Sequence, residues 1–79
     1  MNTEIITEAV KRAKDGVINL GTANGWGQSN RDQCNELRKF MVQGSQQSRN
    51  LGRCYNEYSF NSIIEGQTYK VVYNVDSGD

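Results

Sequence analysis

Residues 58–75 read YSFNSIIEGQTYKVVYNV, two alternating stretches on either side of Glu65–Gly66. One face of the later stretch carries Tyr69, Val71, Tyr73 and Val75. The same spacing in the earlier stretch groups Tyr58, Phe60, Ser62 and Ile64. Alternation with a period of two is typical of β-strands with one buried face. The sequence therefore predicts a strand over 67–75 within an antiparallel hairpin that turns at Glu65–Gly66.

The start of the chain predicts a helix over 4–15. Thr3 offers an N-cap oxygen and Gly16 provides a stop. Apolar residues recur between them at helical spacing, namely Ile5, Ile6, Ala9, Val10 and Ala13. On the polar side, Glu8 and Arg12 stand in the favourable i, i+4 order, so we expect an ion pair between them.

A short strand and a second helix are expected next. The run VINL at 17–20 predicts the strand. Ser29 and Asp32 form a capping pattern. The Ser29 hydroxyl can accept a hydrogen bond from the first helical turn, and the Asp32 carboxylate can accept one from the backbone N–H of Ser29. The apolar side of this helix carries Cys34, Leu37, Phe40, Met41 and Val42. It is expected to continue to about residue 43, where Gly44 ends it.

The middle of the chain is ambiguous, but the fold class follows from the rest. Residues 45–57 allow either a loop or a third helix, and Gly52 counts against the helix. We expect an α+β fold in which two amphipathic helices pack on a small antiparallel sheet with a C-terminal β-hairpin. Residues 1–79 are expected to form a single compact domain.

Composition indicates a small hydrophobic core. Only 35% of the residues are hydrophobic, and a domain of this length buries roughly 60 to 65% of its unfolded surface. Small scaffolds often gain stability from disulfides, metals or oligomers. Cys34 and Cys54 are expected to be free thiols, with a disulfide as the alternative. A homodimer is therefore expected.

The location of the protein is expected to be cytoplasmic. No stretch approaches the roughly 20 apolar residues that a membrane span requires. The chain does not open on a charged segment followed by an apolar one, which is the pattern of a secretion signal. We therefore expect no membrane partner.

Catalysis and metal binding are not expected. The chain contains no histidine, which removes the commonest general base and metal ligand and every Ser-His or Cys-His arrangement. The spacing of the carboxylates does not pair any two of them in one site. The sequence therefore predicts a protein that is not an enzyme and that carries no metal or cofactor.

The glycine-rich loop 21–28 is a candidate ligand site. Backbone N–H groups at a helix N-terminus favour anions, so Ser29 and Arg31 could hold a phosphate while Trp26 stacks on a base. The candidate ligand residues are Gly25, Trp26, Gly27, Ser29 and Arg31. The alternative is that the loop makes a tight turn and Trp26 packs onto the hairpin as part of the core. The spacing matches no named phosphate-binding motif.

Charge is unevenly distributed along the chain. The segment 31–54 carries a net charge of +3, whereas 55–79 carries −3. The candidate partner-binding residues are Arg38, Lys39, Arg49 and Arg53. Tyr55 and Tyr58 follow this segment and could stack on bases, so nucleic acid is a second possible partner of the basic residues. An ordinary solvated face is the simpler explanation.

By elimination, the sequence predicts a small non-enzymatic binding protein that acts by occupying the surface of a protein partner. In size and composition it resembles accessory proteins encoded by phages and other mobile elements, including anti-CRISPR proteins. This resemblance implies an inhibitor of a host defence system. A nucleotide binder using loop 21–28 and a weak nucleic-acid binder using the basic segment are the alternatives.

Overall fold

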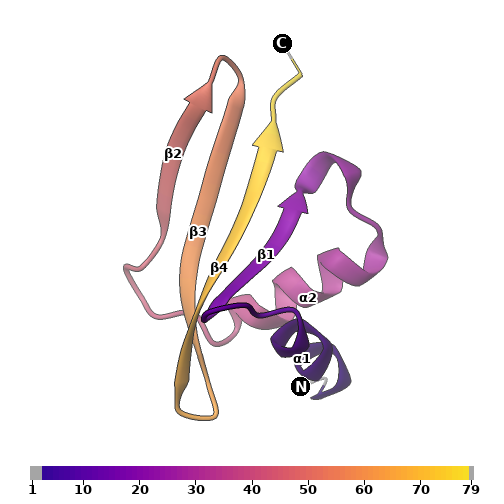
Figure 1. Ribbon diagram of the computed structural model, residues 1–79, viewed down its shortest axis with the longest axis vertical. Helices are drawn as coiled ribbons and strands as arrows, with labels where there is room; N and C mark the ends of the chain where they lie inside the picture. Colours follow the sequence, from indigo (N-terminus) through magenta and orange to yellow (C-terminus); the bar gives the residue numbers. More distant parts are fainter. Residues whose placement is uncertain (1–2, 79) are drawn as a thin grey trace.

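The computed structural model describes residues 3–78 (Figure 1). The helices are α1 (Thr3–Lys11), the 3-10 helix η1 (Ala23–Gly25) and α2 (Gln28–Arg38). The strands are β1 (Val17–Thr22), β2 (Gln47–Gly52), β3 (Tyr55–Ile64) and β4 (Gln67–Asp76). The predicted strand over 67–75 is confirmed as β4, and the run at 17–20 is confirmed as the start of β1.

The strands form one mixed sheet in the order β1-β4-β3-β2. β3 pairs antiparallel with both β2 and β4, whereas β1 pairs parallel with β4. The α+β class is confirmed, but the prediction of a purely antiparallel sheet is wrong. The chain leaves β1 through α2 and the β2–β3 pair before it reaches β4, and this long crossover lets β1 and β4 run in the same direction.

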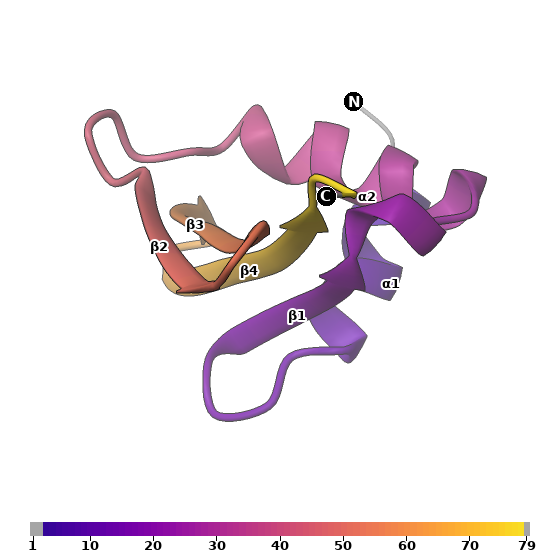
Figure 2. The same cartoon turned by 90° about the horizontal axis from the view of Figure 1, so that it is seen from above.

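Both helices lie on one side of the curved sheet (Figure 2). The core between them draws on every major element except β2, through Ile6, Ala9, Ile18, Leu20, Cys34, Leu37, Phe60, Ile64, Tyr69 and Val71. The alternating residues predicted to share a face therefore do so, and Phe60 pairs in register with Val71. Ile63 and Lys70 point to the other, uncovered face, where both are exposed.

The β3–β4 hairpin turns at Glu65–Gly66, as predicted. Both residues have positive φ, 50° at Glu65 and 79° at Gly66. Two consecutive positive φ values are the hallmark of the turn whose twist matches a two-residue β-hairpin. Gly66 meets this requirement without strain, since it has no Cβ.

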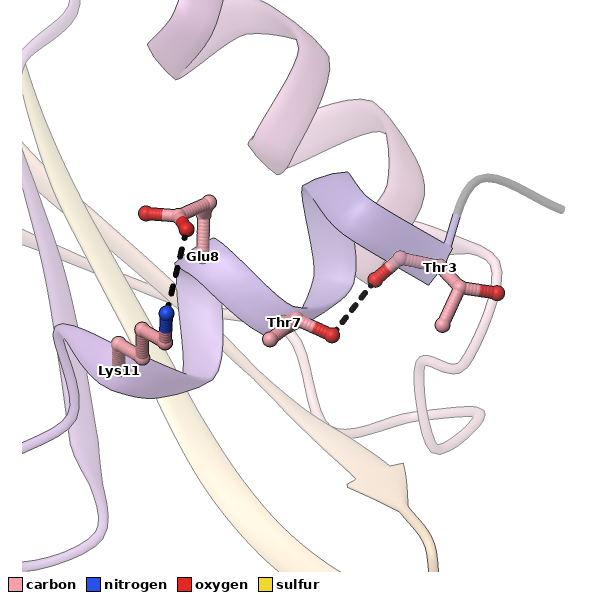
Figure 3. Close-up of polar contacts among 4 residues, drawn as sticks. All are labelled: Thr3, Thr7, Glu8 and Lys11. Atoms are coloured by element: carbon pink, nitrogen blue, oxygen red, sulfur yellow. Dashed lines mark hydrogen bonds and ion pairs between the residues drawn. The ribbon is translucent and has the colours of Figure 1, made fainter.

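α1 ends four residues earlier than predicted, at Lys11 rather than 15. Thr7 donates to the Thr3 carbonyl (2.8 Å) and Lys11 pairs with Glu8 (3.5 Å), as Figure 3 shows. The expected Glu8–Arg12 pair is wrong, because Arg12 lies past the helix end and bonds across to α2 and β1 instead.

α2 is also shorter than predicted. It begins at Gln28 with Gly27 as N-cap and no side-chain capping bond, so the capping pattern at Ser29 is wrong. It ends at Arg38 rather than 43. The reason is tertiary: the Val42 N–H donates to the Asn61 carbonyl (2.8 Å) and the Ile63 N–H to the Phe40 carbonyl (3.1 Å), so residues 40–42 pair with β3 instead of continuing the helix.

The ambiguous segment 45–57 forms neither a loop nor a third helix. It holds β2 and the first residues of β3, joined by a tight turn. Gly52 (φ 144°) and Arg53 (φ 43°) adopt the positive φ values that this turn needs. All six residues of β2 are exposed, so its position depends on backbone pairing with β3 rather than on burial.

Candidate functional site

The loop between β1 and α2 is fastened to the sheet. Asn24 donates to the Asp76 carbonyl (2.7 Å) and accepts from the Asp76 N–H (2.9 Å). The Trp26 indole N–H donates to the Leu20 carbonyl, and its ring lies 5.3 Å from that of Tyr73. Trp26 is half-buried and packs against the core, which agrees with the packing interpretation of this loop.

The predicted ligand residues lie in an electrostatically unfavourable place for an anion. Gly25, Gly27, Ser29 and Arg31 are all exposed. A hollow of about 380 Å³ beside the first turn of α2 contains Ser29, but its lining also includes the carboxylates Glu4, Glu8 and Asp32. Their negative charge opposes the attraction of the helix N-terminus for a phosphate. A nucleotide site on this loop stays a prediction.

The predicted partner-binding cations are spread over two sides of the sheet. Arg49 faces the uncovered side, where it pairs with Glu57 (3.3 Å). Ser48, the preceding residue of β2, pairs in register with Tyr58. Because consecutive strand residues point to opposite faces, Arg49 lies on the face opposite Tyr58. Arg38 lies on the helix side, Lys39 pairs with Glu36 (2.9 Å), and Arg53 lies in the β2–β3 turn. The four cations therefore do not form one patch.

A row of aromatic rings crosses the helix side of the sheet. Tyr58 of β3 and Tyr73 of β4 are partners in register, and their rings stack with centroids 5.6 Å apart and planes 28° apart. Trp26 meets the same Tyr73 from the loop. On β2, the partner of Tyr58 in register is Ser48. The row therefore runs from Trp26 through Tyr73 and Tyr58 and ends at a small hydroxyl side chain.

Arg38, the last residue of α2, lies above this row. Its guanidinium carbon is 5.3 Å from the Phe60 ring centroid and 5.9 Å from that of Tyr73, within range of cation–π attraction. It donates to the Tyr73 hydroxyl (2.7 Å). A hydrogen bond with the Cys34 side chain is the main cause that raises the pKa of Arg38 above its ordinary value. The guanidinium is therefore held as a cation over aromatic faces.

These residues enclose a cavity of about 280 Å³ that we call the aromatic groove, lined by Arg38, Gln46, Gln47, Ser48, Tyr58, Ser59, Phe60 and Tyr73. Its floor is aromatic, one wall is Arg38 and the other is formed by the polar side chains at the start of β2. The sequence predicted Arg38 as a site residue and offered Tyr58 for stacking in the nucleic-acid alternative, but favoured the core as the place of Tyr58 and Tyr73. The groove depends on the register of β2, for which the sequence offered no signal.

The uncovered face of the sheet holds a second, more polar hollow of about 410 Å³, which includes Arg49, Glu57 and Lys70. The Arg49–Glu57 pair neutralises part of its charge. Within residues 3–78, no group of three or more Cys, Asp and Glu side chains is placed to hold a metal ion, and no helix has the length and apolar character needed to cross a membrane.

Comparison with protein-family models, with curated proteins and with solved structures finds no match to this chain.

Proposed function

We propose that this chain is a non-catalytic binding protein that occupies the surface of a protein partner, and that the partner contributes a strand to the free edge of β2. One observation carries the proposal: β2 is an edge strand with all six residues exposed, and within residues 3–78 its one strand neighbour is β3. An edge of this kind offers unpaired backbone N–H and C=O groups.

The composition of β2 supports this mode of binding. Native proteins protect sheet edges with proline, lysine or inward-pointing charges. β2 has the sequence QSRNLG, without proline or lysine, and the charge of Arg49 is engaged by Glu57 on the neighbouring strand. Strand addition draws its affinity from main-chain hydrogen bonds, and side chains along the edge select the partner.

Two of the predicted partner-binding cations belong to this hairpin, since Arg49 lies within β2 and Arg53 in the turn that follows it. Because Glu57 engages the charge of Arg49, Arg53 is the cation of this pair that would favour a partner segment with acidic side chains. An origin in a phage or mobile element, a host defence protein as the partner and a cytoplasmic location remain parts of the same proposal.

The test uses proline to remove single N–H groups from β2. Consecutive residues of an antiparallel edge strand direct their N–H groups alternately toward and away from the neighbouring strand. Of Ser48→Pro and Arg49→Pro, one therefore removes an outward N–H while keeping the β2–β3 pairing. We expect circular dichroism to show that this variant stays folded. The native protein should capture a partner from cell lysate and bind it again after purification, and the variant should fail to bind that purified partner.

Controls separate the edge from other causes. Arg49→Ala removes the charge but keeps the N–H, so it should retain binding at high salt, where charge contributes least. In the native complex, hydrogen exchange should slow at the β2 amides. Full binding by both proline variants in the folded state, or protection confined to β1 or α2, would contradict the proposal. A second copy of this chain on β2 would instead assign the edge to a homodimer.

A further inference from the structure

The aromatic row is incomplete at β2. Tyr58 stacks one face on Tyr73, so its other face is turned away from β4 and toward β2. There the residue in register is Ser48, whose side chain is too small to cover an aromatic ring. The aromatic groove contains this place, since both residues line it. A planar group that entered the groove above Ser48 would stack on Tyr58 and extend the row by one ring.

The charge in the groove is positive. Arg38 is the one charged residue in its lining, which contains no carboxylate. Among the contacts of Arg38 within residues 3–78, none is with a carboxylate. A guanidinium has five N–H donors, and its hydrogen bonds go to two partners, the Tyr73 hydroxyl and the Cys34 side chain. Arg38 therefore keeps donors for an anion. The groove favours an anion in this respect, whereas the hollow beside the first turn of α2 is lined by carboxylates that repel one.

The remaining walls are polar and the space is small. Gln46 and Gln47 supply amide donors and acceptors, and Ser48 and Ser59 supply hydroxyls. A volume of about 280 Å³ lies just below the usual range for ligand sites, which begins at roughly 300 Å³. A planar ring with hydrogen-bonding edges and one attached anionic group matches these features together.

We propose that the aromatic groove binds a nucleoside monophosphate, with its base stacked on Tyr58 above Ser48 and its phosphate held by Arg38. This inference goes beyond the proposed function, because it requires no protein partner and uses the helix side of the sheet rather than the free edge of β2.

The experiment is an NMR titration of the ¹⁵N-labelled protein with AMP, GMP, CMP and UMP in turn. We expect at least one of them to shift the Arg38 side-chain and Ser48 backbone signals. Adenosine or the matching nucleoside tests the ring alone, and inorganic phosphate tests the anion alone. Each should bind at least about tenfold more weakly than the nucleotide, because each leaves one half of the site unused.

Two matched pairs of variants test the contacts. Ser48→Tyr fills the open place in the row and should abolish binding, whereas Leu51→Tyr adds the same side chain to β2 outside the groove and should not. Arg38→Gln should weaken binding about tenfold or more, whereas Lys14→Gln removes a distant exposed cation and should leave it unchanged. Because these substitutions lie on exposed positions, folding is checked by the dispersion of the same spectra.

Three results would overturn the inference. The first is the absence of shifts with all of the nucleotides in the millimolar range. The second is a set of shifts confined to residues 25–31, which would place the ligand on the loop. The third is an oligonucleotide that binds far more tightly than the mononucleotide with a steep salt dependence, which would identify single-stranded nucleic acid as the ligand.

Discussion

The guanidinium of Arg12 joins α1, β1 and α2 at one point. It donates to the Gln33 side chain (3.0 Å), to the Asn19 carbonyl (3.0 Å) and to the Asn30 side chain. Gln33 is itself buried, so the loss of Arg12 would leave the Gln33 side-chain oxygen without its donor, while the amide nitrogen keeps its bond to Ser29. One exposed side chain therefore holds three elements in place.

Arg12→Ala should lower the free energy of unfolding by about 1 to 3 kcal/mol, since hydrogen bonds from a charged donor are lost and the side-chain oxygen of Gln33 loses its donor. Lys11→Ala is the matched control, because the side-chain contact of Lys11 within residues 3–78 is a surface pair with Glu8, in which both side chains are mostly exposed. Its effect should stay under about 0.5 kcal/mol. Urea titration measures both, and equal effects would contradict this role of Arg12.

The sequence assigned Arg12 to an ion pair with Glu8 on the strength of helical spacing. Spacing describes neighbours on one helix, but the partners of Arg12 come from residues 7, 18 and 21 positions later in the chain. No local pattern carries that information. The groove was missed for the same reason, because Ser48 and Tyr58 become neighbours only through the β2–β3 register.

At the scale of elements, prediction succeeded where an element buries a regular face. Apolar residues alternate with a period of two in residues 58–75 because β3 and β4 bury one face beneath the helices. This pattern made both strands of the hairpin, and the turn between them, predictable. β2 buries no face, so QSRNLG carries no alternation. The end of α2 failed because Phe40, Met41 and Val42 suit a helical face as well as a strand, and pairing with β3 decides between them.

The junction of β4 with the β2–β3 turn should respond to pH. The Gly78 N–H and then the Cys54 thiol donate to the Asp76 carboxylate, and these bonds lower its pKa below the ordinary value. A carboxyl with a lowered pKa in the folded state stabilises the protein above its unfolded pKa, and this contribution is lost as pH falls through the folded pKa. Asp76→Asn should therefore be less stable than the native protein at neutral pH, and the two should converge as pH falls through the folded pKa of Asp76. A difference in melting temperature that persists unchanged at low pH would contradict this.

At the scale of the whole molecule, the α+β class followed from counting elements, whereas the parallel pairing of β1 with β4 did not. Those strands lie about 50 residues apart in sequence and no turn connects them, so their direction is decided by the path of the chain through α2, β2 and β3. The open edge of β2 and the aromatic groove both arise from this arrangement, because the core beneath the helices takes residues from β1, β3 and β4 but none from the edge strand β2.

The small hydrophobic core makes the molecule sensitive to single buried contacts. Leu37 is fully buried between α2 and the sheet, and Leu→Ala at such a site costs about 2 to 5 kcal/mol. A domain of this length has a total stability of roughly 4 to 12 kcal/mol, so Leu37→Ala should remove a large share and lower the melting temperature by about 10 °C or more. Leu51→Ala is the matched control, since Leu51 is 43% exposed on β2. It should change the free energy of unfolding by less than about 0.5 kcal/mol. Calorimetry of both variants measures the difference. A loss of stability in Leu51→Ala as large as that in Leu37→Ala would mean that a second copy of the chain covers β2 in solution.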